Sequence, residues 1–255
     1  MSGHWQLRRL AVCASTEREL EGWLRRQPPP APGQPDANRW RRLVVARRQR
    51  FGRGQRGRVW QSPPGGLWLS AAFPWPSDPA NCAPVPLALA LALALELEGL
   101  GRPSRPLPVA IKWPNDLQVS GRKLAGLLPR LRLRQGRVRW AQLGLGLNGI
   151  NRVPPGAVAL AEALQPAAPT ARRSFHPRAT PRALELLARR AIDRAISLAD
   201  QPESVRQAAE QRLWQPPDGL VRNGVSWRIA GLELDGGLRV LDRRGHPTVW
   251  RRDFD

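Results

Sequence analysis

The longest apolar run in the chain extends from Val85 to Leu95, and Leu alternates with Ala in most of it. Alternation at every second residue is typical of a strand, but Leu and Ala are strong helix formers and few residues here are β-branched. We therefore expect a buried helix over 84–98. The run is too short to cross a bilayer, which needs about 20 apolar residues, so we expect no membrane partner.

Length and composition favour a folded chain. The 255 residues are 42% hydrophobic, enough for one large domain or for one with a small second domain. Two cysteines, Cys13 and Cys82, provide neither a disulfide framework nor a metal cage. The chain does not open with a basic and then apolar signal segment. These features disfavour a membrane protein, a secreted scaffold and a zinc module, and they predict a cytoplasmic protein.

The basic residues are almost all arginine. Only two of the 41 basic side chains are lysine, and with 20 acidic side chains the formal net charge is +21. Such a charge is typical of nucleic-acid binding, but a GC-rich coding bias also explains the excess of arginine. Arg replaces Lys on a solvated face, but not where a compact ammonium must reach one oxygen. Lys112 and Lys123 therefore indicate a polar site, with survival by chance as the alternative.

Strand-like and helix-like patterns share the rest of the chain. We expect strands over 4–13, 43–46, 65–73, 109–113, 123–134 and 140–150, and helices over 16–26, 180–199 and 203–214. Ser15 and Thr180 are suitable N-caps. Short strands broken at Asp235-Gly236-Gly237 and at 243–245 predict a small β module at the end of the chain.

Glycine and arginine alternate in a loop, here called the Gly/Arg loop, that extends from Gly52 to Arg58. Glycines allow backbone N–H groups to face an anion, and guanidinium groups donate to phosphate. An RNA-binding tract and a solvated loop without a ligand are the alternatives, but the loop is short and lies between two expected strands. No acidic residue about 20 positions later supports a dinucleotide site.

Lys112 ends an expected strand and precedes the turn Trp113-Pro114-Asn115-Asp116. A rigid turn of this kind fixes an ammonium beside an amide and a carboxylate. The ammonium can neutralise a substrate carboxylate or phosphate, and Asp116 can hold Mg²⁺ or orient an amine. Alternatively, Asn115 and Asp116 only cap the turn and Lys112 pairs with Asp116.

The segment Lys112–Leu117 resembles the signature of the biotin–protein ligases, also called biotin–[acetyl-CoA-carboxylase] ligases. Further motifs resemble the family in the same order, namely Ser15-Thr16, Gln49 with the Gly/Arg loop and Trp60, Gly121–Gly126, Gly144–Asn148 and 231–241. The resemblance implies an α+β fold with two domains. Residues 1–214 would form a catalytic domain with a mixed sheet and flanking helices, similar to class II aminoacyl-tRNA synthetases. Residues 215–255 would form a small SH3-like β-barrel.

The reaction that the resemblance implies has two steps. Biotin and Mg²⁺-ATP give biotinyl-5′-AMP, and a lysine of the biotin carboxyl carrier protein of acetyl-CoA carboxylase then takes the biotin. Biotin, ATP and Mg²⁺ are therefore the implied substrates and cofactors. Only 14 residues precede Ser15, which leaves no room for the helix-turn-helix domain of bifunctional repressor-ligases. We thus expect a monofunctional enzyme that does not bind DNA, and the resemblance allows a homodimer.

The resemblance also implies the site residues. The implied catalytic residues are Lys112, Arg53 and Asp116, with Asp116 also the Mg²⁺ ligand. The implied biotin- and ATP-binding residues are Ser15, Thr16, Gln49, Gly52, Arg53, Gly54, Gln55, Arg56, Gly57, Trp60, Lys112, Asn115, Gly126 and Asn148. Among these, Ser15, Thr16 and Gln49 would bind the ureido ring, Lys112 would bridge the reacting oxygens, and Lys123 would lie close by.

Three positions depart from the family pattern. Gln55 replaces a usual Arg, Glu17 replaces a common Asn, and Arg130 lies near a usual Glu. These departures put retention of the adenylate in doubt. A lipoate–protein ligase and a basic RNA-binding protein remain the rival interpretations, but the Lys112–Asp116 segment favours adenylation and biotin.

Overall fold

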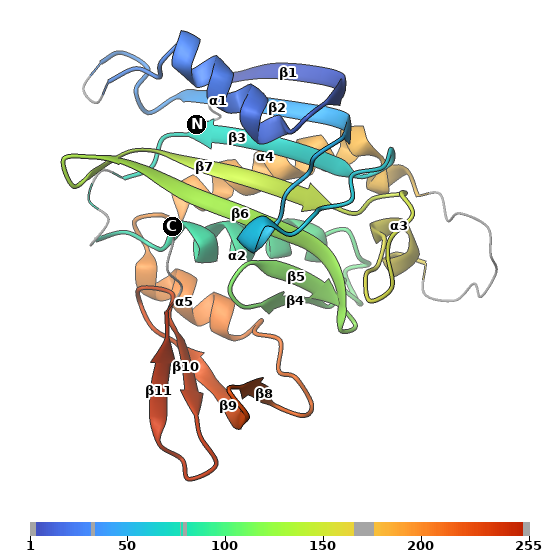
Figure 1. Ribbon diagram of the computed structural model, residues 1–255, viewed down its shortest axis with the longest axis vertical. Coiled ribbons are helices and arrows are strands. Elements are labelled where there is room, and N and C mark those ends of the chain that lie inside the picture. Colours follow the sequence, from blue (N-terminus) through green and yellow to red (C-terminus); the bar gives the residue numbers. More distant parts are fainter. Residues whose placement is uncertain (1–3, 32–33, 77, 79–80, 166–175, 252–255) are drawn as a thin grey trace.

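The computed structural model describes residues 4–31, 34–76, 78, 81–165 and 176–251. A large sheet of seven strands in the order β1-β2-β3-β7-β6-β5-β4 dominates it (Figure 1). Its strands are β1 (His4–Cys13), β2 (Trp40–Gln49), β3 (Leu67–Phe73), β4 (Val109–Lys112), β5 (Asp116–Val119), β6 (Arg122–Arg134) and β7 (Arg137–Leu147).

The sheet is mixed, as expected. β1 and β2 are parallel, and every other neighbouring pair is antiparallel. β2 is longer than the predicted strand over 43–46, because the arginines that flank the apolar residues also pair with β1. Arg41 is buried there, and its Nε lies 2.5 Å from Oδ1 of Asp193. Because this buried arginine is paired with a carboxylate, a hydrophobicity pattern alone does not reveal this part of the strand.

Helix α1 (Thr16–Arg26) covers one face of the sheet near β2 and β3 (Figure 1). Ser15 caps it as predicted, since its side chain accepts a hydrogen bond from the backbone N–H of Glu17 at 3.2 Å. Leu20, Trp23 and Leu24 of α1 pack against Val44 and other apolar residues of β2 and β3. This packing fixes the N-terminus of α1 above the sheet.

The opposite face of the sheet is covered by α2 (Val85–Glu98) and α4 (Pro181–Ser197), and α5 (Pro202–Glu210) packs between α2 and the second sheet (Figure 1). α2 confirms the buried helix predicted for the Leu/Ala run. Its side chains contribute to the largest apolar cluster together with α4 and the sheet, so all sides of α2 are apolar. α4 begins after Thr180, whose hydroxyl accepts from the N–H of Ala183 at 3.4 Å. Two shorter helices are α3 (Leu160–Ala163) and η3 (Pro177–Ala179).

A second, four-stranded antiparallel sheet in the order β11-β10-β9-β8 confirms the small C-terminal β module. Its strands are β8 (Leu220–Arg222), β9 (Val225–Leu232), β10 (Leu238–Leu241) and β11 (Pro247–Trp250). The indole N–H of Trp113, next to β4, donates to the carbonyl of Gly236 at 2.9 Å. The turn after β4 therefore contacts both sheets. Within the described part of the chain, the helices are too short or too polar to span a membrane.

Candidate active site

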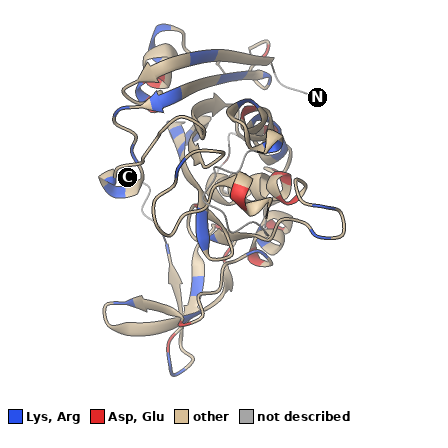
Figure 2. Ribbon diagram, turned by 90° about the vertical axis from the view of Figure 1, so that its right-hand side faces the viewer, with Lys and Arg blue, Asp and Glu red and all other residues tan. Residues whose placement is uncertain are grey.

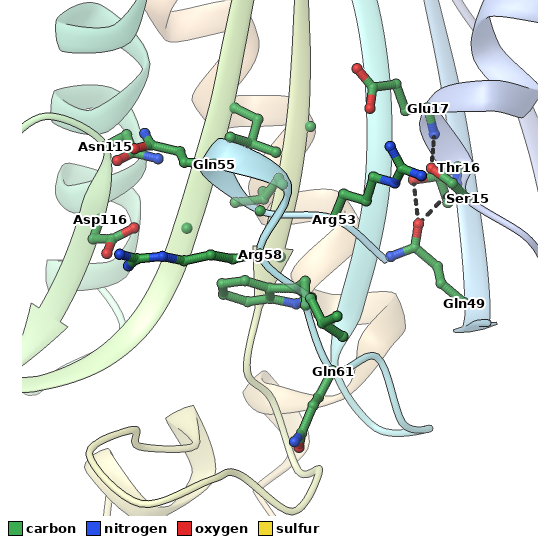
Figure 3. Close-up of a pocket in the computed structure, with 18 of the residues that line it drawn as sticks. Ser15, Thr16, Glu17, Gln49, Arg53, Gln55, Arg58, Gln61, Asn115 and Asp116 are labelled. Atoms are coloured by element: carbon green, nitrogen blue, oxygen red, sulfur yellow. Dashed lines mark hydrogen bonds between the residues drawn. The ribbon is translucent and has the colours of Figure 1, made fainter. Parts of the chain in front are cut away.

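A cavity of about 330 Å³ lies over the centre of the large sheet, beside the N-terminus of α1 (Figure 3). β6 and β7 provide its glycine-containing floor, and the Gly/Arg loop covers it. Of the predicted site residues, the cavity is lined by Ser15, Thr16, Gln49, Arg53, Gly54, Gln55, Trp60, Asn115, Asp116, Gly126 and Asn148. Motifs that are far apart in the sequence therefore meet in one place.

One side of the cavity is formed by buried hydroxyl and amide groups. Gln49 Oε1 accepts from the backbone N–H of Thr16 at 2.8 Å and from its hydroxyl at 3.1 Å (Figure 3). The hydroxyls of Thr16 and Ser70 are 2.9 Å apart, and Gln49 Nε2 donates to Ser62 Oγ at 2.9 Å. Because Thr16 and Ser70 are each 3% exposed, a ligand here needs polar atoms that replace water.

The Gly/Arg loop folds back on itself above this floor. The N–H of Gly54 donates to the carbonyl of Arg58 at 2.7 Å, and the short helix η1 (Gln55–Gly57) forms the tip. Arg56 and Gly57 have positive φ angles of 53° and 70° at this tip. Gly52 lies behind the cavity, where a Cβ would be 2.5 Å from the carbonyl oxygen of Trp60.

Only part of the loop therefore reaches the cavity. Arg53, Gly54, Gln55 and Arg58 line it, whereas Gly52, Arg56 and Gly57 do not. These three predicted binding residues therefore lie outside the lining, because one packs behind the cavity and two form the exposed tip. In Figure 3, Arg58 points toward Asp116.

Trp60 lies flat over the floor of the cavity. A Cβ at Gly146 would be 2.3 Å from its ring, and one at Gly126 would be 2.9 Å from it. Glycine at these two positions therefore makes room for the indole. The Trp60 indole N–H is buried and has no hydrogen-bond partner among the described residues.

An ion pair faces Trp60 from the neighbouring strands β5 and β6. Lys123 Nζ lies 2.8 Å from Oδ2 of Asp116 and 4.9 Å from the centre of the Trp60 ring. Asn115 fixes the turn beside this pair through two hydrogen bonds to Leu127. Its side-chain Nδ2 donates to the backbone carbonyl of Leu127, and its backbone carbonyl accepts from the N–H of Leu127 at 2.8 Å. The cavity thus holds one ammonium in a defined position.

Lys112, whose ammonium was expected to bridge the reacting oxygens, lies outside the lining of the cavity. Ile111 in β4 exchanges backbone hydrogen bonds with the segment after α5, from its N–H to Arg212 and from the N–H of Trp214 to its carbonyl. This pairing brings the Trp214 ring to Lys112, whose Nζ is 5.0 Å from the ring centre. Lys123, in contrast, lines the cavity.

Sequence reasoning missed several other lining residues. Ser70 is the one polar residue of the strand over 67–73, and that isolation in an apolar strand was a signal. Also missed were Val59, Gln61, Leu69, Leu128, Pro154 and Ala157, whereas Glu17, Arg58, Lys123, Gly144, Leu145 and Gly146 line the cavity from motifs or positions already noted in the sequence. Glu17 accepts from Arg130 at 2.6 Å, so two of the three departures from the family pattern pair with each other.

Metal-binding clusters and reactive thiols are not found in the described part of the chain. No group of three His, Cys, Asp or Glu side chains lies together among residues 4–31, 34–76, 78, 81–165 and 176–251. Burial, together with the charge of Glu19, raises the pKa of the Cys13 thiol to about 11. Cys13 is therefore protonated at neutral pH and unsuited as a nucleophile.

The model of the biotin/lipoate A/B protein ligase family matches residues 37–148. This segment carries the Gly/Arg loop, the ion pair and the glycine floor. Residues 37–148 belong to the biotin/lipoate A/B protein ligase family. Curated relatives include bifunctional ligase/repressor BirA proteins. That of Escherichia coli (strain K12) is 30% identical over 204 residues, which is 79% of this chain and 59% of that protein.

The chain spans about a third of the Bacillus subtilis (strain 168) BirA protein, with 37% identity over 113 residues, 44% of this chain and 33% of that protein. Two solved ligase structures share the fold over nearly the whole chain. The biotin protein ligase from Aquifex aeolicus in complex with biotin and ATP has a TM-score of 0.68 at 22% identity, covering 96% and 94% of the two chains. That from Leishmania major with biotinyl-5-AMP has a TM-score of 0.59 at 20% identity, covering 97% and 99%.

Proposed function

We propose that this chain is a biotin–protein ligase of the biotin–[acetyl-CoA-carboxylase] type. It would form biotinyl-5′-AMP from biotin and Mg²⁺-ATP and transfer biotin to a lysine of a biotin carboxyl carrier protein. The observation that carries this proposal is a single cavity with a buried polar set on one side and cations on the other (Figure 3). The ligands named for the Aquifex and Leishmania structures support it.

The polar side of the cavity fits the ureido ring of biotin, which has one carbonyl and two N–H groups. Thr16, Ser70 and Gln49 supply hydroxyl and amide groups there, and Ser15 lies beside them. A ring that pairs with these groups compensates for their loss of water. We therefore assign this side to the ring and the opposite side to the carboxylate and nucleotide.

A lipoate–protein ligase is the second candidate, because the family includes both activities. The dithiolane ring of lipoate has no hydrogen-bond donor and would leave the hydroxyls of Thr16 and Ser70 without ligand partners. A site built to hydrogen-bond its substrate discriminates strongly against an analogue that lacks the polar group. The buried hydroxyls therefore favour biotin.

The first chemical step joins two anions, the biotin carboxylate and the α-phosphate of ATP. Lys123, Arg53 and Arg58 would lower their repulsion and stabilise the charge that develops on the phosphate oxygens as pyrophosphate leaves. Lys123 is already held by Asp116 at 2.8 Å, so little reorganisation is needed. Trp60 and Asn148, which both line the cavity, would border the nucleotide.

The acidic residues at this end fit a magnesium ion that arrives with ATP. Mg²⁺ in nucleotide sites is held by one or two carboxylates together with phosphate oxygens and water. Asp116 is the cavity carboxylate on the nucleotide side, with Asn115 next to it. Asp116 would thus orient Lys123 and contribute to the metal-bound nucleotide.

In the second step an acceptor lysine enters the same cavity. Its neutral amine attacks the carbonyl carbon of the mixed anhydride, the bond to the phosphate oxygen breaks, and AMP leaves while the amine loses a proton. Arg53 and Arg58, from the loop that covers the cavity, would stabilise the departing phosphate.

We also propose the domain division at 214/215, with residues 215–255 as an SH3-like barrel. Support comes from side chains that join the two edge strands of the small sheet. Trp250 of β11 contacts Trp227 of β9 with ring centres 5.7 Å apart, and the Arg222 guanidinium of β8 lies 5.0 Å from the centre of the Trp250 ring. The curled sheet packs beside α5.

Pyrophosphate release tests this proposal. We expect release that requires both biotin and ATP and that Lys123→Ala abolishes. The same assay with lipoate in place of biotin distinguishes the two ligases, and release with lipoate alone would support the second candidate instead.

A further inference from the structure

Six arginines lead from the end of β2 to the mouth of the cavity. They are Arg47, Arg48, Arg50, Arg53, Arg56 and Arg58, and the segment 47–59 contains no acidic residue. All six side chains are exposed. Among the described residues, none of the six forms an ion pair, although acidic partners hold many other arginines of the chain. This segment therefore presents unneutralised positive charge.

Three exposed apolar residues lie among these arginines. Val12 is 49% exposed, Phe51 is 63% exposed and Val59 is 82% exposed. The backbone places them together, since Val12 is the β1 partner of Arg48 and the N–H of Phe51 donates to the carbonyl of Ala14 at 2.9 Å. Val59 bridges to Arg53 at the base of the loop. We call the segment 47–59 together with Val12 the mouth surface.

The mouth surface is continuous with the cavity. Gln49, Arg53, Arg58 and Val59 belong to the segment and also line the cavity. Figure 2 shows further arginines along the two strands at the top, β1 and β2. Any lysine that enters the cavity from another protein must bring its surrounding surface against this rim.

We propose that the mouth surface is the docking site for an acidic protein face that presents the acceptor lysine. The inference rests on the proposed function and specifies what surrounds that lysine. Carboxylates would flank it to meet Arg48 and Arg50, and an apolar side chain would contact Phe51. Positive potential at the rim accelerates encounter with such a face, and the apolar contact adds affinity at the centre.

An acidic protein fits the mouth surface better than a nucleic acid does. Single-stranded nucleic acids bind grooves that combine cations with several aromatic rings for base stacking. Phe51 is the one aromatic residue of the mouth surface, and the side chains of its apolar neighbours Val12 and Val59 have no aromatic ring on which a base could stack. Aliphatic contacts inside a charged rim are typical of protein interfaces.

The test reverses charge at Arg48 and Arg50 together, because neither residue lines the cavity. For R48E/R50E we expect unchanged pyrophosphate release from biotin and ATP. The kcat/KM for a biotin carboxyl carrier domain should fall about tenfold or more at low ionic strength, and the loss should shrink as salt is added. Phe51→Ser should raise KM for the carrier with little effect on pyrophosphate release.

The matched control is R102E/R105E, which makes the same change in net charge in the turn after α2. Both arginines are exposed and away from the cavity. The control should leave both half-reactions unchanged. Thermal unfolding of all variants checks that the fold is intact.

A charge-swapped carrier sharpens the test. A carrier domain whose acidic residues nearest the acceptor lysine are replaced by Lys should react poorly with the wild type and better with R48E/R50E.

Unchanged carrier kinetics in R48E/R50E, an equal loss in the control variant, or a parallel loss of pyrophosphate release would each overturn the proposal. So would tight binding of a labelled single-stranded RNA that R48E/R50E abolishes while carrier kinetics stay unchanged. Absence of pyrophosphate release by the wild type would instead remove the proposed function and, with it, this inference.

Discussion

Lys123 and Asp116 form an ion pair with 2.8 Å between Nζ and Oδ2, across the adjacent strands β5 and β6. This ion pair fixes an ammonium 4.9 Å from the centre of the Trp60 ring, which rests on the glycine floor. The rest of the cavity is organised around this position, with the hydroxyl and amide set on one side and the Gly/Arg loop as cover.

The two lysines of the chain provide a direct comparison. Lys123→Arg should lower pyrophosphate release about a hundredfold, because the planar guanidinium group of Arg is too large to take the position of the Lys ammonium between two oxygens. Lys112→Arg should retain most of the activity, since Lys112 contacts Trp214 outside the cavity. The opposite order of the two losses would restore Lys112 to the catalytic position.

Thr16→Val removes a buried hydroxyl while keeping the shape of the side chain. A buried polar partner left unpaired costs about 1–3 kcal/mol, so KM for biotin should rise about tenfold while KM for ATP changes little. Thr180→Val is the control, because it removes the N-cap of α4 and costs about 1 kcal/mol of stability without touching the cavity. Equal effects of both variants on KM for biotin would contradict the assignment of the ring.

Gly146→Ala places a methyl group 2.3 Å from the Trp60 ring, whereas Gly144→Ala on the same strand meets its nearest neighbour at 3.4 Å. The first substitution should displace the indole, change the tryptophan fluorescence of the ligand-free protein and reduce adenylate formation. The second should leave the ligand-free fluorescence as in the wild type. Identical spectra for the two variants would show that Trp60 does not rest on Gly146.

Gln55 lines the cavity at a position where the family resemblance implies an arginine. Arg53 and Arg58 still reach the cavity, so the first half-reaction should proceed. A charged hydrogen bond contributes about 1.5–3 kcal/mol, and Gln55→Arg should therefore slow the release of preformed biotinyl-5′-AMP about tenfold or more. Equal release in a chase experiment would mean that a neighbouring arginine already fills the role.

The sequence pattern was sufficient for most elements of the fold. The Leu/Ala run formed the predicted buried helix, and Ser15 and Thr180 capped the predicted helices. Local propensity and capping chemistry decide such features within a few residues of the chain. The ends of β2 were missed because Arg41 is buried only through its partner Asp193, which lies in α4.

The sequence predicted the cavity lining correctly for several residues that belong to recognisable motifs. Thr16, Gln49 and Asp116 reach the cavity as expected. The position of Lys112 outside the cavity was not predictable, because it depends on the pairing of β4 with the segment after α5. That pairing is set by tertiary packing of residues about a hundred positions apart, which no local pattern encodes.

Mass spectrometry of a biotin carboxyl carrier domain incubated with this protein, ATP, Mg²⁺ and an equimolar mixture of biotin and lipoate tests whether the protein transfers biotin. We predict a mass gain of one biotin on one lysine with the wild type and no gain with Lys123→Ala. A gain of one lipoyl group, or an unmodified carrier with the wild-type protein, would contradict the account.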